Sequence, residues 1–176
     1  MSEFRKANTY RPFFVTLSVV GWIDVFTRAE YCEEVIKNLE YCRKHKGLKI
    51  YAYCIMSSHI HLIVAHDESR LPNIIRDFKS FTAKQIIHSI INNPTESRKE
   101  WLLYLFKFFA AQQSQNSEYQ FWQKTIHPTE LITAPVFEQK VDYIHHNPVA
   151  AGLVTEATTY KYSSACFDSP LVVDES

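Results

Sequence analysis

Residues 48–65, LKIYAYCIMSSHIHLIVA, carry the clearest structural pattern in the chain. Apolar residues alternate along both halves of this stretch, and a period of two is typical of β-strands that are buried on one face. Ser57-Ser58 forms a tight connection between the halves, so the stretch predicts a β-hairpin. Because successive side chains of a strand point to opposite faces, Ile60 should face the core while His59 and His61 share the other face.

Regular elements are predicted on both sides of this hairpin. Before it, alternation predicts a strand over 13–22, and a Thr27–Glu30 capping box predicts a helix that ends near Lys46, where Gly47 is a stop signal. After it, we expect a helix from Pro72, a helix from the capping box 97–100 to about 111, a strand over 118–126, and a helix from 133 to about 147, before Pro148.

The order strand, helix, strand, strand, helix is typical of an α+β, ferredoxin-like fold, in which an antiparallel sheet carries helices on one face. The other face of such a sheet is free for a ligand. With 176 residues, the chain has the length of one domain. We expect a single domain over 1–167, whose C-terminal helix carries Tyr143, and a disordered acidic tail over 168–176.

The composition excludes several classes of protein. Three glycines, Gly21, Gly47 and Gly152, are too far apart to build a phosphate-binding loop or a dinucleotide fingerprint. Four cysteines without a C-x-x-C pair argue against a zinc ribbon and are consistent with a reducing cytoplasm. Because the sequence has neither an apolar signal core nor an 18-residue apolar run, we expect a cytoplasmic protein without a membrane partner.

The formal net charge is zero, but the charge is unevenly distributed along the chain. Residues 1–100 carry 15 basic and 11 acidic residues, whereas residues 101–176 carry 4 and 8. A nucleic-acid surface should therefore lie mainly in the first 100 residues. The candidate DNA-binding residues are basic side chains and one base-stacking aromatic: Arg43, Lys44, Lys46, Lys49, Arg76, Lys79, Lys84, Lys140 and Trp122. The alternative is that the charges lie on solvated helix faces and that the tryptophan lies in the core.

Two pairs of residues have chemistry that the fold does not need. His59 and His61 should lie about 6.5–7 Å apart along one strand face, where two imidazoles can bind one divalent ion. Tyr143 and Asn147 are four residues apart, which places a phenol and a carboxamide side by side on the last helix. Taken alone, the pairs have plainer interpretations as solvent-facing histidines, an amphipathic tyrosine and a helix C-terminal asparagine.

Four blocks of sequence together resemble a known family. The blocks are YCIMSSHIHLI (53–63), FKSFT (78–82), FWQ (121–123) and YIHHNPVAAGLV (143–154). With them, the chain resembles the HUH single-strand DNA endonucleases, and among these the IS200/IS605-type tyrosine (Y1) transposases, especially the REP-associated branch. The resemblance covers most of the chain.

The resemblance implies a role for each pair. His59 and His61 would bind a divalent metal, Mg or Mn, and Tyr143 would be the catalytic nucleophile. Asn147 stands where IS200-type enzymes have a glutamine ligand, but it is one methylene shorter, so His146 or His145 are alternative third ligands. The implied reaction is a metal-assisted transesterification, in which the tyrosine forms a 5′-phosphotyrosine and releases a 3′-OH for strand rejoining. A nearby cation such as Lys140, one turn earlier, would favour the phenolate.

The implied partner is single-stranded DNA with hairpins, as in REP-like repeats or transposon ends. The block 147–154 and the long insertion at about 92–130 resemble the REP-associated branch more closely, which favours a monomer over a homodimer.

Three other interpretations remain open at the level of sequence. The first is a catalytically inactive or domesticated protein that binds hairpin DNA. The second is a ferredoxin-like nucleic-acid-binding module, although no RNP1-like strand is present. The third is a metal-dependent hydrolase in which His66, Asp67 or Glu68 adds ligands to the His pair, although these residues lie beyond the end of the strand.

Overall fold

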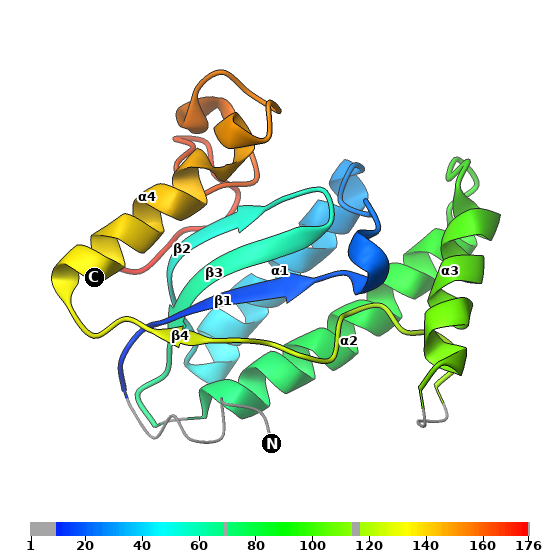
Figure 1. Cartoon of the computed structure of the whole chain (residues 1–176), viewed down its shortest axis with the longest axis horizontal. Coiled ribbons are helices and arrows are strands. Elements are labelled where there is room, and N and C mark those ends of the chain that lie inside the picture. The colour runs from blue at the N-terminus through cyan, green and yellow to red at the C-terminus, as the bar shows by residue number, and fades with distance from the viewer. Residues whose placement is uncertain (1–9, 69, 114–116, 176) are drawn as a thin grey trace.

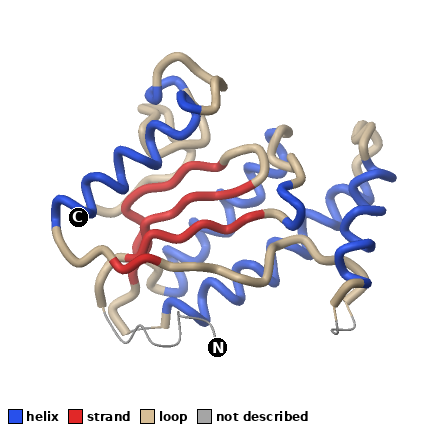
Figure 2. Tube along the Cα trace, viewed as in Figure 1, coloured by secondary structure: helices blue, strands red, loops and turns tan. Residues whose placement is uncertain are grey.

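The described residues form one antiparallel sheet of four strands at the centre of the molecule (Figures 1 and 2). The computed structural model describes residues 10–68, 70–113 and 117–175. The order across the sheet is β2-β3-β1-β4, from the strands β1 (Phe13–Ser18), β2 (Lys49–Ile55), β3 (His59–Ala65) and β4 (Thr129–Glu130). The hairpin β2–β3 and the β-α-β-β-α-β order confirm the ferredoxin-like prediction.

The two long helices of this fold cover one face of the sheet. They are α1 (Ala29–Lys46) and α2 (Leu71–Asn92), which pack against each other. The other helices are α3 (Lys99–Ala111), which packs on α2 and on the 3-10 helix η2 (Val20–Trp22), and α4 (Ala134–Ala150), which is followed by η3 (Ala157–Thr159). No helix in the described parts of the chain has both the length and the apolar composition that crossing a membrane requires.

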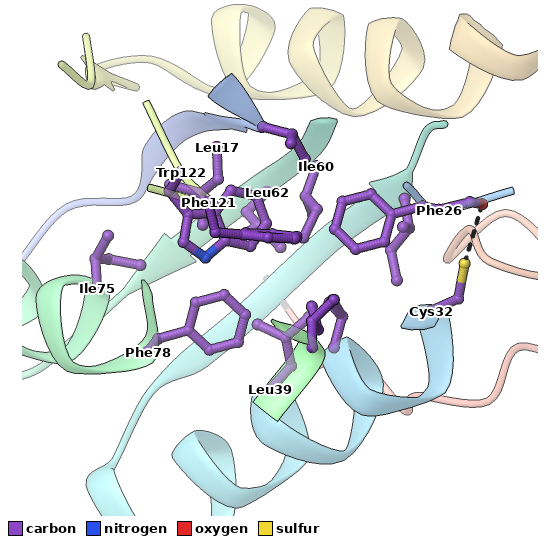
Figure 3. Close-up of a cluster of buried hydrophobic side chains, with 14 of the residues drawn as sticks. Leu17, Phe26, Cys32, Leu39, Ile60, Leu62, Ile75, Phe78, Phe121 and Trp122 are labelled. Atoms are coloured by element: carbon purple, nitrogen blue, oxygen red, sulfur yellow. Dashed lines mark hydrogen bonds between the residues drawn. The ribbon is translucent and has the colours of Figure 1, made fainter. Parts of the chain in front are cut away.

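The main hydrophobic core lies between the sheet and the layer of α1 and α2 (Figure 3). Leu17, Ile60 and Leu62 reach it from β1 and β3. Trp122 also belongs to it, and its Nε1 donates a hydrogen bond to Thr82 Oγ1 over 3.0 Å. Each such apolar side chain contributes about 1.5–3 kcal/mol when it is fully buried. This burial fixes which face of β3 points away from α1 and α2.

The opposite face of the sheet is partly covered, because α4 lies against β2 and β3. A second, smaller cluster joins Cys54 and Ile63 of the sheet to Ile144 of α4. A register shift between Ile50 and Ala52 reverses the alternation of β2, so that Ile50 reaches the main core whereas Ala52 and Cys54 face α4. The face that we expect to be free for a ligand is therefore partly covered by α4, and the position of α4 defines what is left open.

Several boundaries differ from the sequence-based expectation. β1 ends at Ser18, before Gly21 turns the chain with a φ of 62°. The segment 118–126 contributes only an isolated bridge between Val19 and Trp122 and is not a strand. The expected capping boxes do not form: α1 and α3 begin after Arg28 and Arg98, and neither cap residue makes a side-chain cap hydrogen bond.

α4 continues past Pro148, where the sequence predicts that the helix ends. A proline inside a helix loses the hydrogen bond of its own nitrogen. Here the following turn is still closed, because Ala151 N–H donates to Asn147 O over 2.9 Å and Leu153 N–H donates to Pro148 O over 2.9 Å. The buried Pro148 ring packs within the fold, so tertiary contacts outweigh the local preference.

The acidic tail also differs from expectation, because it packs along the outer edge of β2. Asp174 N–H donates to Ile50 O over 2.7 Å, and the Asp174 carboxylate accepts a hydrogen bond from Ile50 N–H and pairs with Arg43 at 2.8 Å. Leu171 is only 2% exposed. The prediction of disorder was based on local charge alone. The unpaired backbone N–H and C=O groups of an edge strand, however, favour any segment that can form hydrogen bonds with them.

Candidate active site

The centre of the candidate site is the pair His59 and His61 on β3. Both imidazoles lie on the face of the sheet that α4 partly covers, as the alternation along 59–65 predicts. Their Nε2 atoms are 3.1 Å apart. His61 is buried and His59 is half-buried, so the pair forms a recessed site at the beginning of the strand.

Neighbouring hydroxyls hold the other nitrogen of each ring. Thr16 Oγ1 lies 2.9 Å from His61 Nδ1, and Ser58 Oγ lies 3.2 Å from His59 Nδ1. Thr16 is opposite His61 in the register of β1 and β3. Because both Nδ1 atoms have a partner, the two Nε2 atoms are left to face each other.

Both imidazoles favour the neutral form. Burial, and secondly the neighbouring His59, lower the pKa of His61 to about 3. Burial also lowers the pKa of His59, and Asp24 opposes this shift. A neutral imidazole is the form that binds metals.

This geometry fits a divalent metal. Two nitrogens that each lie ~2.1 Å from one ion, at roughly a right angle, are about 3 Å apart, close to the observed separation. The described residues contain no cluster of three His, Cys, Asp or Glu side chains that would make a metal site alone. A third protein ligand would therefore be of another kind, and a carboxamide oxygen suits Mg or Mn.

α4 brings both members of the second pair to the histidines. The Tyr143 ring lies 5.4 Å from the His61 ring and 5.8 Å from the Phe14 ring, measured between centroids, and the side chain is 48% exposed. Asn147 is close enough to His61 to act as a hydrogen-bond acceptor that opposes the lowering of the His61 pKa. Asn147 Nδ2 donates to Tyr143 O over 2.8 Å, which leaves its oxygen available on the side of the histidines.

Lys140 lies on the same face of α4, one turn before Tyr143. Its Nζ is 5.2 Å from the centroid of the Tyr143 ring and 4.8 Å from that of Phe14. An ammonium at this position places positive charge beside the phenol ring.

The other two histidines of α4 lie elsewhere. His145 Nε2 is 2.8 Å from Ser164 Oγ, so this ring points to the C-terminal segment, and burial lowers its pKa. His146 is exposed and, within the described residues, makes none of the ring contacts with the His pair that Tyr143 makes. Asn147 is therefore better placed than His145 or His146 to be the third ligand.

Most of the predicted DNA-binding cations lie in or near the layer of α1 and α2, on the other side of the sheet from α4 (Figure 1). Many of them already have acidic partners: Arg43 with Asp174, Lys44 with Glu40, Lys46 and Arg76 with Asp77, and Lys49 with Asp67. Lys84 lines a groove between α1 and α2. Of the nine predicted residues, Lys140 is the one that the structure places beside the His pair and Tyr143.

Two of the nine predicted residues are partly or wholly internal. Lys79 Nζ donates to Gln123 O over 2.7 Å, and burial lowers its pKa to about 8. Trp122 is 5% exposed and lies in the main core. The prediction that Trp122 stacks on DNA bases was therefore wrong, because the segment 118–126 folds under the edge of the sheet and is not an exposed strand.

Sequence reasoning missed Thr16 and Trp22, which both contact the histidines. The alternation of β1 assigns Thr16 to the face opposite Leu17, so a hydroxyl beside the His pair could have been found once the strand pairing was known. The Trp22 ring lies 5.3 Å from the His59 ring. In the sequence, Trp22 directly follows Gly21 at the end of the first predicted strand. This position next to a glycine was the one feature that could have indicated an exposed tryptophan at a turn.

Comparisons with known proteins bear on the family and the fold of the chain. A family model described as "Transposase IS200 like" matches residues 23–129, which is more than half of the chain and includes His59 and His61 but ends before α4. A solved structure described as a REP-associated tyrosine transposase bound to a REP hairpin matches with a TM-score of 0.61 and 19% identity, covering 93% of this chain and 82% of that chain. A transposase structure from Deinococcus radiodurans R1 matches with a TM-score of 0.45 and 13% identity, covering 80% and 93%. No curated protein sequence gives a match.

Proposed function

Because the chain belongs to the IS200-like transposase family, we propose that it is a single-strand DNA transposase that cuts and rejoins DNA through Tyr143. One observation carries this proposal: an exposed phenol on α4 lies beside two convergent, neutral imidazoles on β3. A phosphodiester placed between these groups would meet a nucleophile on one side and a cation-binding pair on the other.

The reaction conserves the energy of the phosphodiester bond. The Tyr143 oxygen forms a bond to phosphorus, the bond from phosphorus to the 3′ oxygen breaks, and the phenol proton leaves so that the 3′ oxygen departs as a hydroxyl. The product is a 5′-phosphotyrosine, and attack by a 3′-OH on this intermediate reverses the step and joins the strands. No nucleotide cofactor is needed, which agrees with a chain whose glycines cannot build a phosphate loop.

His59, His61 and Asn147 would hold a divalent cation, Mg or Mn, which when bound supplies polarisation of the scissile phosphate and neutralisation of its charge. Thr16 and Ser58 orient the two imidazoles through their Nδ1 atoms. Lys140 holds positive charge beside the Tyr143 ring, where it would attract the scissile phosphate.

The proposed partner is single-stranded DNA that folds into hairpins. The solved structure with the 0.61 TM-score is described as bound to a REP hairpin, and hairpin DNA is accordingly the first substrate to test. The cations on α1 and α2 lie on the other side of the sheet from Tyr143. We therefore propose that they contact DNA outside the cleavage position.

The test is a covalent adduct on denaturing gels. Labelled single-stranded oligonucleotides that carry hairpins from the DNA around the gene would be mixed with protein and Mn²⁺ or Mg²⁺. We expect an adduct with the unaltered chain, and its loss in Tyr143→Phe, in His59→Ala and on addition of EDTA. Tyr104→Phe is the matched control, because Tyr104 is also exposed but lies on α3.

Each other outcome favours a different function. Cut strands without an adduct, unchanged in Tyr143→Phe, would favour a metal-dependent hydrolase. Bound but uncut hairpins would favour a DNA-binding protein without catalysis.

A further inference from the structure

The turn after β1 holds a tryptophan in an unusual backbone conformation. Gly21 and Trp22 have φ angles of 62° and 56°, and Trp22 is the one non-glycine residue of the described chain with a positive φ. This region of backbone space is disfavoured for large side chains and costs roughly 1–3 kcal/mol at a site where the surrounding structure maintains it. Such outliers concentrate at functional sites.

Two contacts from other segments and one hydrogen bond within the turn maintain this conformation. A Cβ atom at Gly21 would lie 2.6 Å from Phe109 Cζ, so the α3 ring fits closely against the glycine. Val20 N–H donates to Phe121 O over 2.8 Å, and Trp22 N–H donates to Val19 O over 3.1 Å. The turn therefore lies between the end of β1 and α3, where Figure 1 shows it.

The Trp22 side chain is positioned beside the candidate site and contributes little to the core. It is 55% exposed, and its ring lies 5.3 Å from the His59 ring at an angle of 76°. An indole that is more than half exposed keeps part of its apolar surface in water, which packing alone does not favour.

We infer that Trp22 is a nucleobase-stacking residue, and that it binds a base of single-stranded DNA next to the phosphate held at His59 and His61. This rests on the proposed function, since it places the phosphodiester at the His pair. Every nucleobase has a π-face, and a stacked base contributes to binding whatever its identity. Tyr143 approaches from α4 and Trp22 from η2, so the strand would lie between the two rings with its backbone at the histidines.

Intrinsic fluorescence tests this assignment without any cleavage. The chain has three tryptophans, and Trp122 is buried, so Trp22 and the 52% exposed Trp101 of α3 are the accessible ones. Adding a short single-stranded oligonucleotide without metal should quench the fluorescence of the unaltered chain and of Trp101→Phe. The quenching should be lost in Trp22→Phe. Quenching that persists in Trp22→Phe would overturn the inference.

Affinity provides the second measurement. Trp22→Gly removes the ring and suits the positive φ, so the fold should be retained, as a melting curve checks. We expect Trp22→Gly to bind the oligonucleotide about 5- to 100-fold more weakly, Trp22→Phe to stay within a few-fold, and Trp101→Gln to match the unaltered chain. One abasic site next to the cleavage position should weaken binding by the unaltered chain but not further weaken binding by Trp22→Gly.

The outcomes separate this inference from the proposed function. If the adduct forms while Trp22→Gly binds normal and abasic strands like the unaltered chain, Tyr143 chemistry holds and the stacking role is wrong. If Trp22-dependent quenching and base discrimination are seen but no adduct forms, stacking holds and the transposase reaction is wrong.

Discussion

At the scale of single residues, one hydroxyl outside the sequence motifs orients the site. Thr16 Oγ1 lies 2.9 Å from His61 Nδ1, and this contact leaves Nε2 directed at His59. Hydrogen bonds to the second nitrogen of a metal-binding histidine fix its tautomer and its orientation. Thr16 therefore contributes to the proposed metal site without touching the metal.

Replacing this hydroxyl tests that role. Thr16→Val keeps the shape of the side chain but loses the hydrogen bond, and we expect about 10- to 100-fold weaker Mn²⁺ binding, measured by calorimetry or by the Mn²⁺ concentration that gives half-maximal adduct. Thr16→Ser keeps the hydroxyl and should remain within a few-fold of the unaltered chain. Equal metal affinity in both variants would contradict a positioning role for Thr16.

At the scale of elements, the connection from α1 to β2 depends on one glycine. Gly47 ends α1 with a φ of 67°, and its N–H donates to Cys42 O. A Cβ at this position would lie 3.2 Å from His66 Nε2.

Substitution of Gly47 should mainly reduce stability. We expect Gly47→Ala to lower the free energy of unfolding by about 1–2 kcal/mol, because alanine adopts a positive φ poorly and would press on His66. Gly47→Asn should lose less, since asparagine tolerates this conformation. Denaturant melts would measure both variants, and a larger loss for Asn than for Ala would argue that the contact with His66 dominates.

Lys79 of α2 gives an alkaline dependence of stability. Burial lowers its pKa from 10.5 to about 8, so between these pH values the unfolded chain binds more protons than the folded chain. The free energy of unfolding therefore rises as the pH increases from about 8 to 10.5, by at most ~1.4 kcal/mol per pH unit. It decreases by the same amount when the pH is lowered through this window.

The comparison that isolates Lys79 is with Lys79→Met. The difference in unfolding free energy between the unaltered chain and this variant should change with pH in the window from 8 to 10.5. Lys84→Met, on the same helix, serves as the control. Parallel pH profiles for the unaltered chain and Lys79→Met would contradict the assignment.

At the scale of the whole molecule, the C-terminal segment covers the edge strand β2, and α4 covers part of the sheet face that carries the His pair. Residues 162–174 run along β2, where Ile55 N–H donates to Tyr162 O over 2.9 Å and Ser164 N–H donates to Tyr53 O over 3.0 Å. β2 is an edge strand, and such edges favour association with other chains unless they are covered.

Removing the anchor of this segment should destabilise the molecule. Leu171 is 2% exposed and packs in the main core, so Leu171→Ala should lower the free energy of unfolding by about 2–4 kcal/mol. Val172, which is 71% exposed, is the matched control, and Val172→Ala should change little. Equal melting temperatures for the two variants would mean that the segment does not contribute to the fold.

A single chain supplies both halves of the proposed site, which favours action as a monomer. Tyr143 of α4 lies beside His61 of the same chain. Mixing Tyr143→Phe with His59→Ala should therefore leave adduct formation absent, as in each variant alone. Adduct formed by the mixture would show that one chain contributes the tyrosine and its partner the histidines, as in a homodimer with shared sites.

Local sequence patterns predict the β2–β3 hairpin and the face of the sheet that each histidine occupies. Alternation over 59–65 is a local pattern that separates Ile60 from His59 and His61 by backbone geometry alone, and the structure agrees. The four-residue spacing of Tyr143 and Asn147 likewise predicts their side-by-side placement on α4.

The surroundings of these residues depend on contacts between segments that are far apart in the sequence. No local pattern indicates that α4 crosses onto the open face of the sheet, that Trp122 enters the core, or that Asp174 pairs with Arg43. These outcomes depend on competition among distant segments for the same apolar surface and the same unpaired backbone groups, which spacing along the chain does not record. For the same reason Trp22 became visible as a site residue only when β1, α3 and His59 were seen together.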